Sequence, residues 1–160
     1  MTKNDKMCLF YGGPFSQWYI APMEINRVTY NCCEQWMMYN KAMMFNDVTA
    51  ATKIMCADNP RQQKRLGRNV VGFDKARWDL AAPDIVYAGN LAKFTQYAEH
   101  RKTLMDTGDL IIVEASPYDH IWGIGIAEDD PAAFDQSRWM GTNWLGIAIM
   151  RTRDTLRQTP

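Results

Sequence analysis

The sequence has 160 residues, of which 47% are hydrophobic and 22% charged, and this predicts one globular domain over residues 1–160. Its 18 basic residues balance its 18 acidic residues, so the net charge favours no nucleic acid, membrane surface or acidic partner. A local cluster of cations would therefore have to hold an anionic ligand. No apolar stretch approaches the ~18 residues of a membrane span, and the polar N-terminus precedes no signal-like apolar region. These features predict a soluble, cytoplasmic protein.

The cysteines and histidines do not form a metal-binding pattern. The four cysteines show no C-x-x-C spacing and no secretory context, so we expect reduced thiols; they are Cys8, Cys32, Cys33 and Cys56. The two histidines, His100 and His120, lie at no recognisable ligand spacing from these cysteines. We therefore predict no metal and no cofactor.

The first half of the chain predicts two short strands followed by helices. Runs rich in aromatic or β-branched residues at 8–11 and 27–30 are typical of strands that pair as a small sheet. Apolar residues then recur near a 3.6-residue period, which predicts a long helix over 31–45. Asp47 is a suitable cap for a second helix, and Asn59 before Pro60 for a third that ends at Gly67.

The second half predicts further helices around one strong strand. A short helix is expected over 74–82, another from Pro83 towards Tyr97, and a third that ends at Thr107–Gly108. The β-branched run 110–114 is the strongest strand candidate, with 121–124 as its partner. Thr142 is a suitable cap for a final helix. The pattern predicts a mainly helical α+β fold with a minor sheet.

Two charged residues of the first helix, Glu34 and Lys41, are candidates for chemistry. They lie seven residues apart, which is two helical turns, so both side chains leave the helix on nearly the same face. Such a pair usually belongs to a solvated face. The neighbouring Trp36, Met37 and Met38 leave little of this helix polar, which favours a functional role.

Asp119 is the second candidate carboxylate. It follows the predicted strand in Ser116-Pro-Tyr-Asp-His-Ile-Trp-Gly123, where proline and glycine fix an irregular loop beside a scaffold element. The alternative is an ordinary Asx turn. Trp78 and Trp122 are similarly either core aromatics or stacking platforms, and Arg68 either satisfies helix-end carbonyls or grips a phosphate.

In order and spacing, these residues together resemble the YbiA-like or NADAR family, from Phe10 to Arg153. The matching elements are Phe15-Ser-Gln-Trp18, Glu34-Gln-Trp36 with Lys41-Ala42, Gly67-Arg68, Trp78, Lys93-Phe94, Thr107-Gly108, Glu114, Asp119 with Trp122-Gly123, Gly125, Gly141-Thr-Asn143, Leu145-Gly146, Met150 and Arg153. The chain departs from the family pattern at Gln17, where asparagine is usual, and at Gln35-Trp36, where histidine and tyrosine are usual. The segment 126–140 also looks longer than in many relatives.

The resemblance implies a compact YbiA-like α+β domain of orthogonal helices and an N-glycosidase activity without a cofactor. Glu34 and Asp119 would be the acidic pair, and Lys41 would bind phosphate or attack an opened ribose as an amine. Arg68 would clamp phosphate and Asn143 would orient a hydroxyl. The remaining substrate contacts would come from Trp78, Trp122, Phe15 and Ser16.

Family members cleave either ADP-ribose from guanine or ribosylamino-pyrimidine 5′-phosphates of riboflavin biosynthesis, and the first is the activity we expect here. The partner would thus be a nucleotide-like small molecule or an ADP-ribosylated nucleic-acid base. Two other classes stay open. One is a non-catalytic module that binds ADP-ribose or a nucleotide, and the other is a structural protein whose tryptophans and methionines only fill a core.

Overall fold

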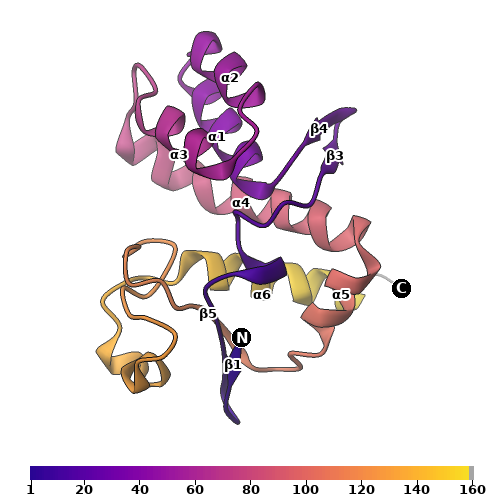
Figure 1. Cartoon of the computed structure of the whole chain (residues 1–160), viewed down its shortest axis with the longest axis vertical. Coiled ribbons are helices and arrows are strands. Elements are labelled where there is room, and N and C mark those ends of the chain that lie inside the picture. The colour runs from indigo at the N-terminus through magenta and orange to yellow at the C-terminus, as the bar shows by residue number, and fades with distance from the viewer. Residues whose placement is uncertain (159–160) are drawn as a thin grey trace. The chain divides into compact units, whose positions relative to one another are not determined.

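The computed structural model describes residues 1–158, and the chain divides into two compact units (Figure 1). The central unit is one continuous segment, Gln17–Gln96, and the split unit combines Met1–Ser16 with the chain from Tyr97 onward. The central unit holds four helices and a hairpin, whereas the split unit holds a three-stranded sheet and two helices. The mainly helical α+β fold predicted from the sequence is confirmed.

In the central unit, α1 packs against each of the other three helices (Figure 1). The helices are α1 (Cys33–Met44), α2 (Val48–Met55), α3 (Pro60–Arg68) and α4 (Lys75–Gln96). Asp47 caps α2 by accepting from the Ala50 N–H at 2.9 Å, and Asn59 caps α3 by accepting from the Gln62 N–H at 3.0 Å. Both caps agree with the sequence prediction, because a short side-chain acceptor before a helix satisfies an otherwise unpaired N–H.

The prediction that a new helix begins at Pro83 is wrong, since α4 runs through the proline. Proline removes one intrahelical bond and costs about 3 kcal/mol. Buried residues recur every three or four positions on both sides of it, at Trp78, Ala82, Val86, Gly89 and Lys93. Burial of an apolar side chain stabilises by about 1.5–3 kcal/mol, so a continuous buried stripe outweighs the lost bond.

The predicted pairing between 8–11 and 27–30 is also wrong. The second run forms β4 (Val28–Tyr30), which pairs antiparallel with β3 (Met23–Ile25). Asn26 and Arg27 connect the two strands with φ values of 53° and 66°. Two consecutive residues with positive φ make a type I′ turn, whose twist suits a tight hairpin. The turn carries no glycine, so its usual sequence signal is missing.

The sheet of the split unit has the order β1–β2–β5, with bounds Thr2–Lys3, Met7–Phe10 and Ile111–Glu114. Strand β2 pairs antiparallel with β1 and parallel with β5. All four residues of β2 are buried, as is typical of a central strand covered on both faces. The prediction of a strand over 110–114 is confirmed, but its partner is β2.

Segment 121–124 forms no strand, so the prediction that it pairs with β5 is wrong. It remains attached through one bond, in which the Ile124 N–H donates to the Glu114 carbonyl at 3.0 Å. The loop continues through the short 3₁₀ helices η2 (Pro131–Phe134) and η3 (Gln136–Arg138), while a third, η1 (Gly13–Phe15), follows β2. Ile124 and Ile126 enter the core with Leu9 and Val113.

Helix α6 (Trp144–Gln158) packs against β5, and α5 (Ala98–Met105) packs against α6. A Cβ at Gly146 would collide with the Ile112 carbonyl, so glycine permits this close approach of helix and strand. Thr142 does not cap the helix as predicted. Its hydroxyl donates to the Ile121 carbonyl at 2.7 Å, and the first turn begins at the Asn143 carbonyl, which accepts from the Ile147 N–H.

Candidate functional site

Glu34 stands in the first turn of α1 and is 5% exposed. Its backbone N–H donates to the Gln17 carbonyl at 3.0 Å, which satisfies one of the free donors at the helix start. A carboxylate in this turn is favoured by the helix dipole. The fold therefore places a buried acid at a fixed point on α1.

Lys41 lies two turns further along α1 and is half-buried between aromatic rings. Its Nζ lies 4.2 Å from the centre of the Phe73 ring and 5.7 Å from that of Trp78. Burial lowers the pKa of the Lys41 amine, Glu34 opposes this shift, and Arg68 adds to it. The electrostatic coupling puts Glu34, Lys41 and Arg68 in one neighbourhood, as the seven-residue spacing predicted for the first two.

The position of Arg68 follows from the packing of α3 on α1. A Cβ at the preceding Gly67 would collide with Met38 Sδ, so glycine lets the end of α3 approach α1 closely. Arg68 itself is exposed. Its guanidinium has five donors in a planar fork, which suits a phosphate better than a point charge does.

In the split unit, Asp119 belongs to a loop that its own carboxylate organises. Its Oδ1 accepts from the Ile121 N–H at 3.0 Å and from the Trp122 N–H at 2.8 Å. This is the Asx-type geometry considered from the sequence. The turn fixes the carboxylate next to Trp122, whose ring meets that of Trp144 edge-on at 5.5 Å.

Asn143 is buried, with φ at 52°, and connects β5 to the start of α6. Its Oδ1 accepts from the Glu114 N–H at 3.0 Å, and its Nδ2 donates to the Ile112 carbonyl at 2.9 Å. Both halves of the amide thus bind backbone of the strand.

Phe15 is likewise buried, with its ring edge-on to Phe10 at 5.5 Å, and Ser16 donates its N–H to the Gly13 carbonyl at 3.0 Å.

The candidate residues thus fall into two groups. Glu34, Lys41, Arg68 and Trp78 gather in the central unit. The others belong to the split unit, and these are Asp119, Trp122, Asn143, Phe15 and Ser16. Sequence reasoning missed Phe73, which is 43% exposed and whose ring centre lies closer to the Lys41 amine than that of Trp78. Its only sequence signal is an aromatic residue in a glycine-containing loop before a helix.

A second missed feature is the amide pair of Gln17 and Asn90. Asn90 Nδ2 donates to Gln17 Oε1 at 2.9 Å, and both side chains are buried. Within residues 1–158, Gln17 Nε2 and Asn90 Oδ1 have no hydrogen-bond partner. Buried polar atoms are seldom unpaired, and Gln17 is also where the sequence departs from the family pattern.

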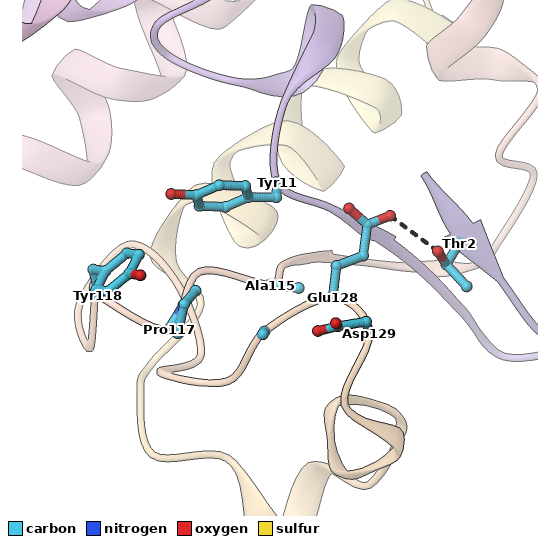
Figure 2. A pocket seen from close by; sticks show the side chains of 8 residues that line it. Thr2, Tyr11, Ala115, Pro117, Tyr118, Glu128 and Asp129 are labelled. Atoms are coloured by element: carbon cyan, nitrogen blue, oxygen red, sulfur yellow. Dashed lines mark hydrogen bonds between the residues drawn. The ribbon is translucent and has the colours of Figure 1, made fainter.

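A pocket of about 390 Å³ opens in the split unit, and Figure 2 shows Tyr11 on one side of it, facing Pro117 and Asp129. It is lined by Thr2, Tyr11, Ala115, Pro117, Tyr118, Ala127, Glu128 and Asp129. Glu128 is held in place, since its Oε1 accepts from the Thr2 hydroxyl at 3.0 Å. Three of these residues, Ala127, Glu128 and Asp129, belong to segment 126–140, which looks longer than in many relatives. None of the candidate site residues lines the pocket.

Among the residues that the structure describes, no three His, Cys, Asp or Glu side chains are grouped so as to hold a metal ion. No helix in this part of the chain is long and apolar enough to cross a membrane.

The buried Glu34 carboxylate and the cation of Arg68 both influence the half-buried amine of Lys41, and such groups can exchange protons and bind anions. The NADAR domain model matches residues 9–157, and the chain belongs to this family. The chain is 36% identical to N-glycosidase R617 of Acanthamoeba polyphaga mimivirus, over 98% of this chain and 99% of that protein. It is therefore a hydrolase of the N-glycosidase class.

Two further comparisons find similar proteins. Protein irg-1 of Caenorhabditis elegans is 38% identical over 79% of this chain, and the match covers 61% of that protein. The NMR structure of the E. coli protein YbiA has a TM-score of 0.79 and 25% identity, and the match covers 98% of this chain and 88% of that chain. The predicted YbiA-like fold is confirmed.

Proposed function

We propose that this N-glycosidase removes ADP-ribose from guanine. The observation that carries the proposal is the setting of Lys41, a half-buried amine between two aromatic rings that is coupled electrostatically to Glu34 and Arg68. Two cations close together suit the two phosphates of ADP-ribose, and aromatic faces beside them suit its adenine or ribose rings.

The reaction breaks the bond between the anomeric carbon of the ribose and the guanine nitrogen. Water gives its oxygen to that carbon and its proton to the leaving guanine. Positive charge develops on the ribose as the bond breaks, so a carboxylate beside it lowers the barrier. We assign Glu34 and Asp119 as the two acids of this step, and Lys41 and Arg68 as phosphate anchors. We assign Trp78 and Trp122 as aromatic contacts to the nucleotide.

The supporting residues also have roles in this proposal. Asn143 fixes the strand from which the Asp119 loop departs, since its amide binds the backbone of Glu114 and Ile112. Phe15 and Ser16 shape the chain that leads to Gln17. The family match runs through both units, which supports their acting as one functional domain.

The proposal is tested by incubating the purified protein with ADP-ribosylated guanosine and, separately, with a ribosylamino-pyrimidine 5′-phosphate. We expect guanosine and ADP-ribose from the first substrate, detected by liquid chromatography and mass spectrometry. Glu34→Gln is the matched control, because it keeps the side-chain shape and removes the charge.

Other outcomes identify the alternatives. Base release from the pyrimidine substrate alone would replace the proposed substrate by a riboflavin-biosynthesis intermediate. A thermal shift with ADP-ribose and no turnover of either substrate would indicate a binding module.

A further inference from the structure

The loop over residues 69–74, between α3 and α4, holds an aromatic side chain over the amine of Lys41. Lys41 Nζ lies 4.2 Å from the centre of the Phe73 ring, well inside the distance of about 6 Å over which a ring face attracts a cation. The centre of the Trp78 ring is further away, at 5.7 Å. Phe73 therefore makes the closer of these two ring contacts to the amine.

The backbone next to Phe73 is anchored to the start of α2. Asp47 caps α2 through its Oδ1, and its Oδ2 accepts from the Val71 N–H at 2.9 Å. These backbone bonds lower the pKa of the Asp47 carboxyl, and the bond from Val71 is the larger cause. Gly72 follows with φ at 74°, a conformation that glycine adopts without a steric penalty. An anchored loop with a glycine turn thus presents Phe73 to α1.

The Phe73 ring is supported by a second ring, that of Phe45 at the end of α1. The two rings meet edge-on, with centres 5.5 Å apart and an interplanar angle of 72°. This arrangement is attractive, because the positive edge of one ring meets the negative face of the other. Lys41 and Phe45 are four residues apart, which is about one helical turn. The ring and the amine are thus held by neighbouring positions of the same helix.

Packing alone explains little of this arrangement. Phe73 is 43% exposed, so its ring buries less apolar surface than a core residue does. Burial lowers the pKa of the Lys41 amine, which means that the amine lies where its charge is disfavoured. A ring face attracts the charged form and offsets part of that cost. A cation held in this way has little side-chain freedom left to lose when it binds an anion.

We propose that Phe73 is a positioning residue, which holds the Lys41 ammonium in the place where it binds a phosphate of the substrate. This inference rests on the proposed function and extends it, because it makes a flexible lysine a fixed anchor. Phe73 acts through Lys41 and not through contact with the substrate. It should therefore change KM much more than kcat.

The test separates the ring face from its bulk. Phe73→Leu keeps an apolar side chain and removes the ring, whereas Phe73→Tyr keeps the ring. The control variant is Val71→Ala, which shortens an exposed apolar side chain of the same loop and leaves the backbone bond to Asp47 intact. The midpoint of thermal unfolding checks that each variant is folded.

We expect Phe73→Leu to raise KM for ADP-ribosylated guanosine about fivefold, the size of a partly desolvated cation–π contact, with little change in kcat. Phe73→Tyr and Val71→Ala should keep the wild-type KM. In a Lys41→Met background, which lacks the charge, Phe73→Leu should have no further effect on KM. Multiplying effects of the two substitutions would overturn the proposal, since the ring would then contact the substrate itself. An unchanged KM in Phe73→Leu would overturn it as well.

Failure of the proposed function would be recognised separately. If the wild-type protein cleaves only the ribosylamino-pyrimidine 5′-phosphate, the same variants are measured on that substrate, which also carries a phosphate. If it cleaves neither substrate, the probe is inorganic pyrophosphate, whose dissociation constant is measured from the NMR signal of the Lys41 ε-carbon. The spectrum of Lys41→Met identifies that signal by its loss. Weaker pyrophosphate binding by Phe73→Leu than by Val71→Ala would support the proposal, and equal binding would refute it.

Discussion

The two units differ in charge, although the whole chain is neutral. The central unit has ten basic and seven acidic residues, whereas the split unit has eight basic and eleven acidic residues. The excess of each sign is therefore three. An overall balance of charges gave no reason to expect an anionic partner, but charge acts over about 8–10 Å at physiological salt. The local balance on α1 and α3 decides which ligands that surface attracts.

The two candidate acids also sit in different settings. Glu34 is placed by a helix and is buried near a lysine and an arginine. Asp119 is placed by a loop and is bound by two backbone N–H groups. A helix-borne acid keeps its position when its charge is removed, whereas the loop depends on the carboxylate that it contains. The difference predicts distinct responses to the same kind of substitution.

The largest expected effect comes from the paired substitutions Glu34→Gln and Asp119→Asn. Each should reduce kcat by at least about 100-fold, or ~2.7 kcal/mol, because a catalytic carboxylate typically contributes that much. If both act on one step, the double variant should be scarcely slower than the slower single variant. The measurement is single-turnover kinetics on folded protein.

If the two reductions in kcat multiply in the double variant, Asp119 instead supports the structure of its loop, and Glu34 alone takes part in the chemistry. Asp119→Asn should also lower the melting temperature, since the charged acceptor of the loop is lost, while Glu34→Gln should change it little. Wild-type turnover in folded Glu34→Gln would remove that residue from the site.

A middle-sized effect is expected from Asn143→Ala. The change leaves the Glu114 N–H and the Ile112 carbonyl without their partners and puts alanine at positive φ. We expect the free energy of unfolding to fall by about 2 kcal/mol, measured by urea denaturation. Asn143→Asp, which keeps one acceptor, should lose less. Normal stability together with lost activity would contradict the positioning role and indicate a direct contact with substrate.

The smallest effect, about tenfold in KM, is expected at Lys41. A phosphate-binding lysine acts as a point charge, so Lys41→Arg should keep most activity and Lys41→Ala should mainly raise KM. Steady-state kinetics of both variants provide the measurement. Trapping by borohydride distinguishes the other role, because an adduct mapped to Lys41 would identify the amine as a nucleophile. Normal turnover in both variants without an adduct would remove Lys41 from the site residues.

Local features of the fold were predictable from the sequence. The caps at Asp47 and Asn59 depend on neighbouring residues alone, and so does the β-branched run of β5. Pairings over long distances were not predictable, because the partner of β5 is decided by what the rest of the chain buries. The helix start predicted at Pro83 was wrong for the same reason, since tertiary packing outweighed the low helix propensity of proline.

The candidate site was predictable to a similar extent. Helical spacing was enough to group Glu34 with Lys41, and the family resemblance added Arg68 and Trp78. Phe73 lies in a loop, where no period relates its position to α1, so only the folded chain identifies it as a neighbour of Lys41.

The parallel pairing of β2 with β5 has a consequence for the order of folding. Met7 pairs with Ile111, so in the sequence the whole central unit falls between the two paired strands. A ribosome completes Gln17–Gln96 while β2 still has no β5, and a unit complete in sequence can form its local helices first. Once those helices are packed, the loop that β2 and β5 must close contains far fewer free residues, and its closure costs less entropy. Early folding of the central unit would thus make the final pairing of β2 with β5 faster.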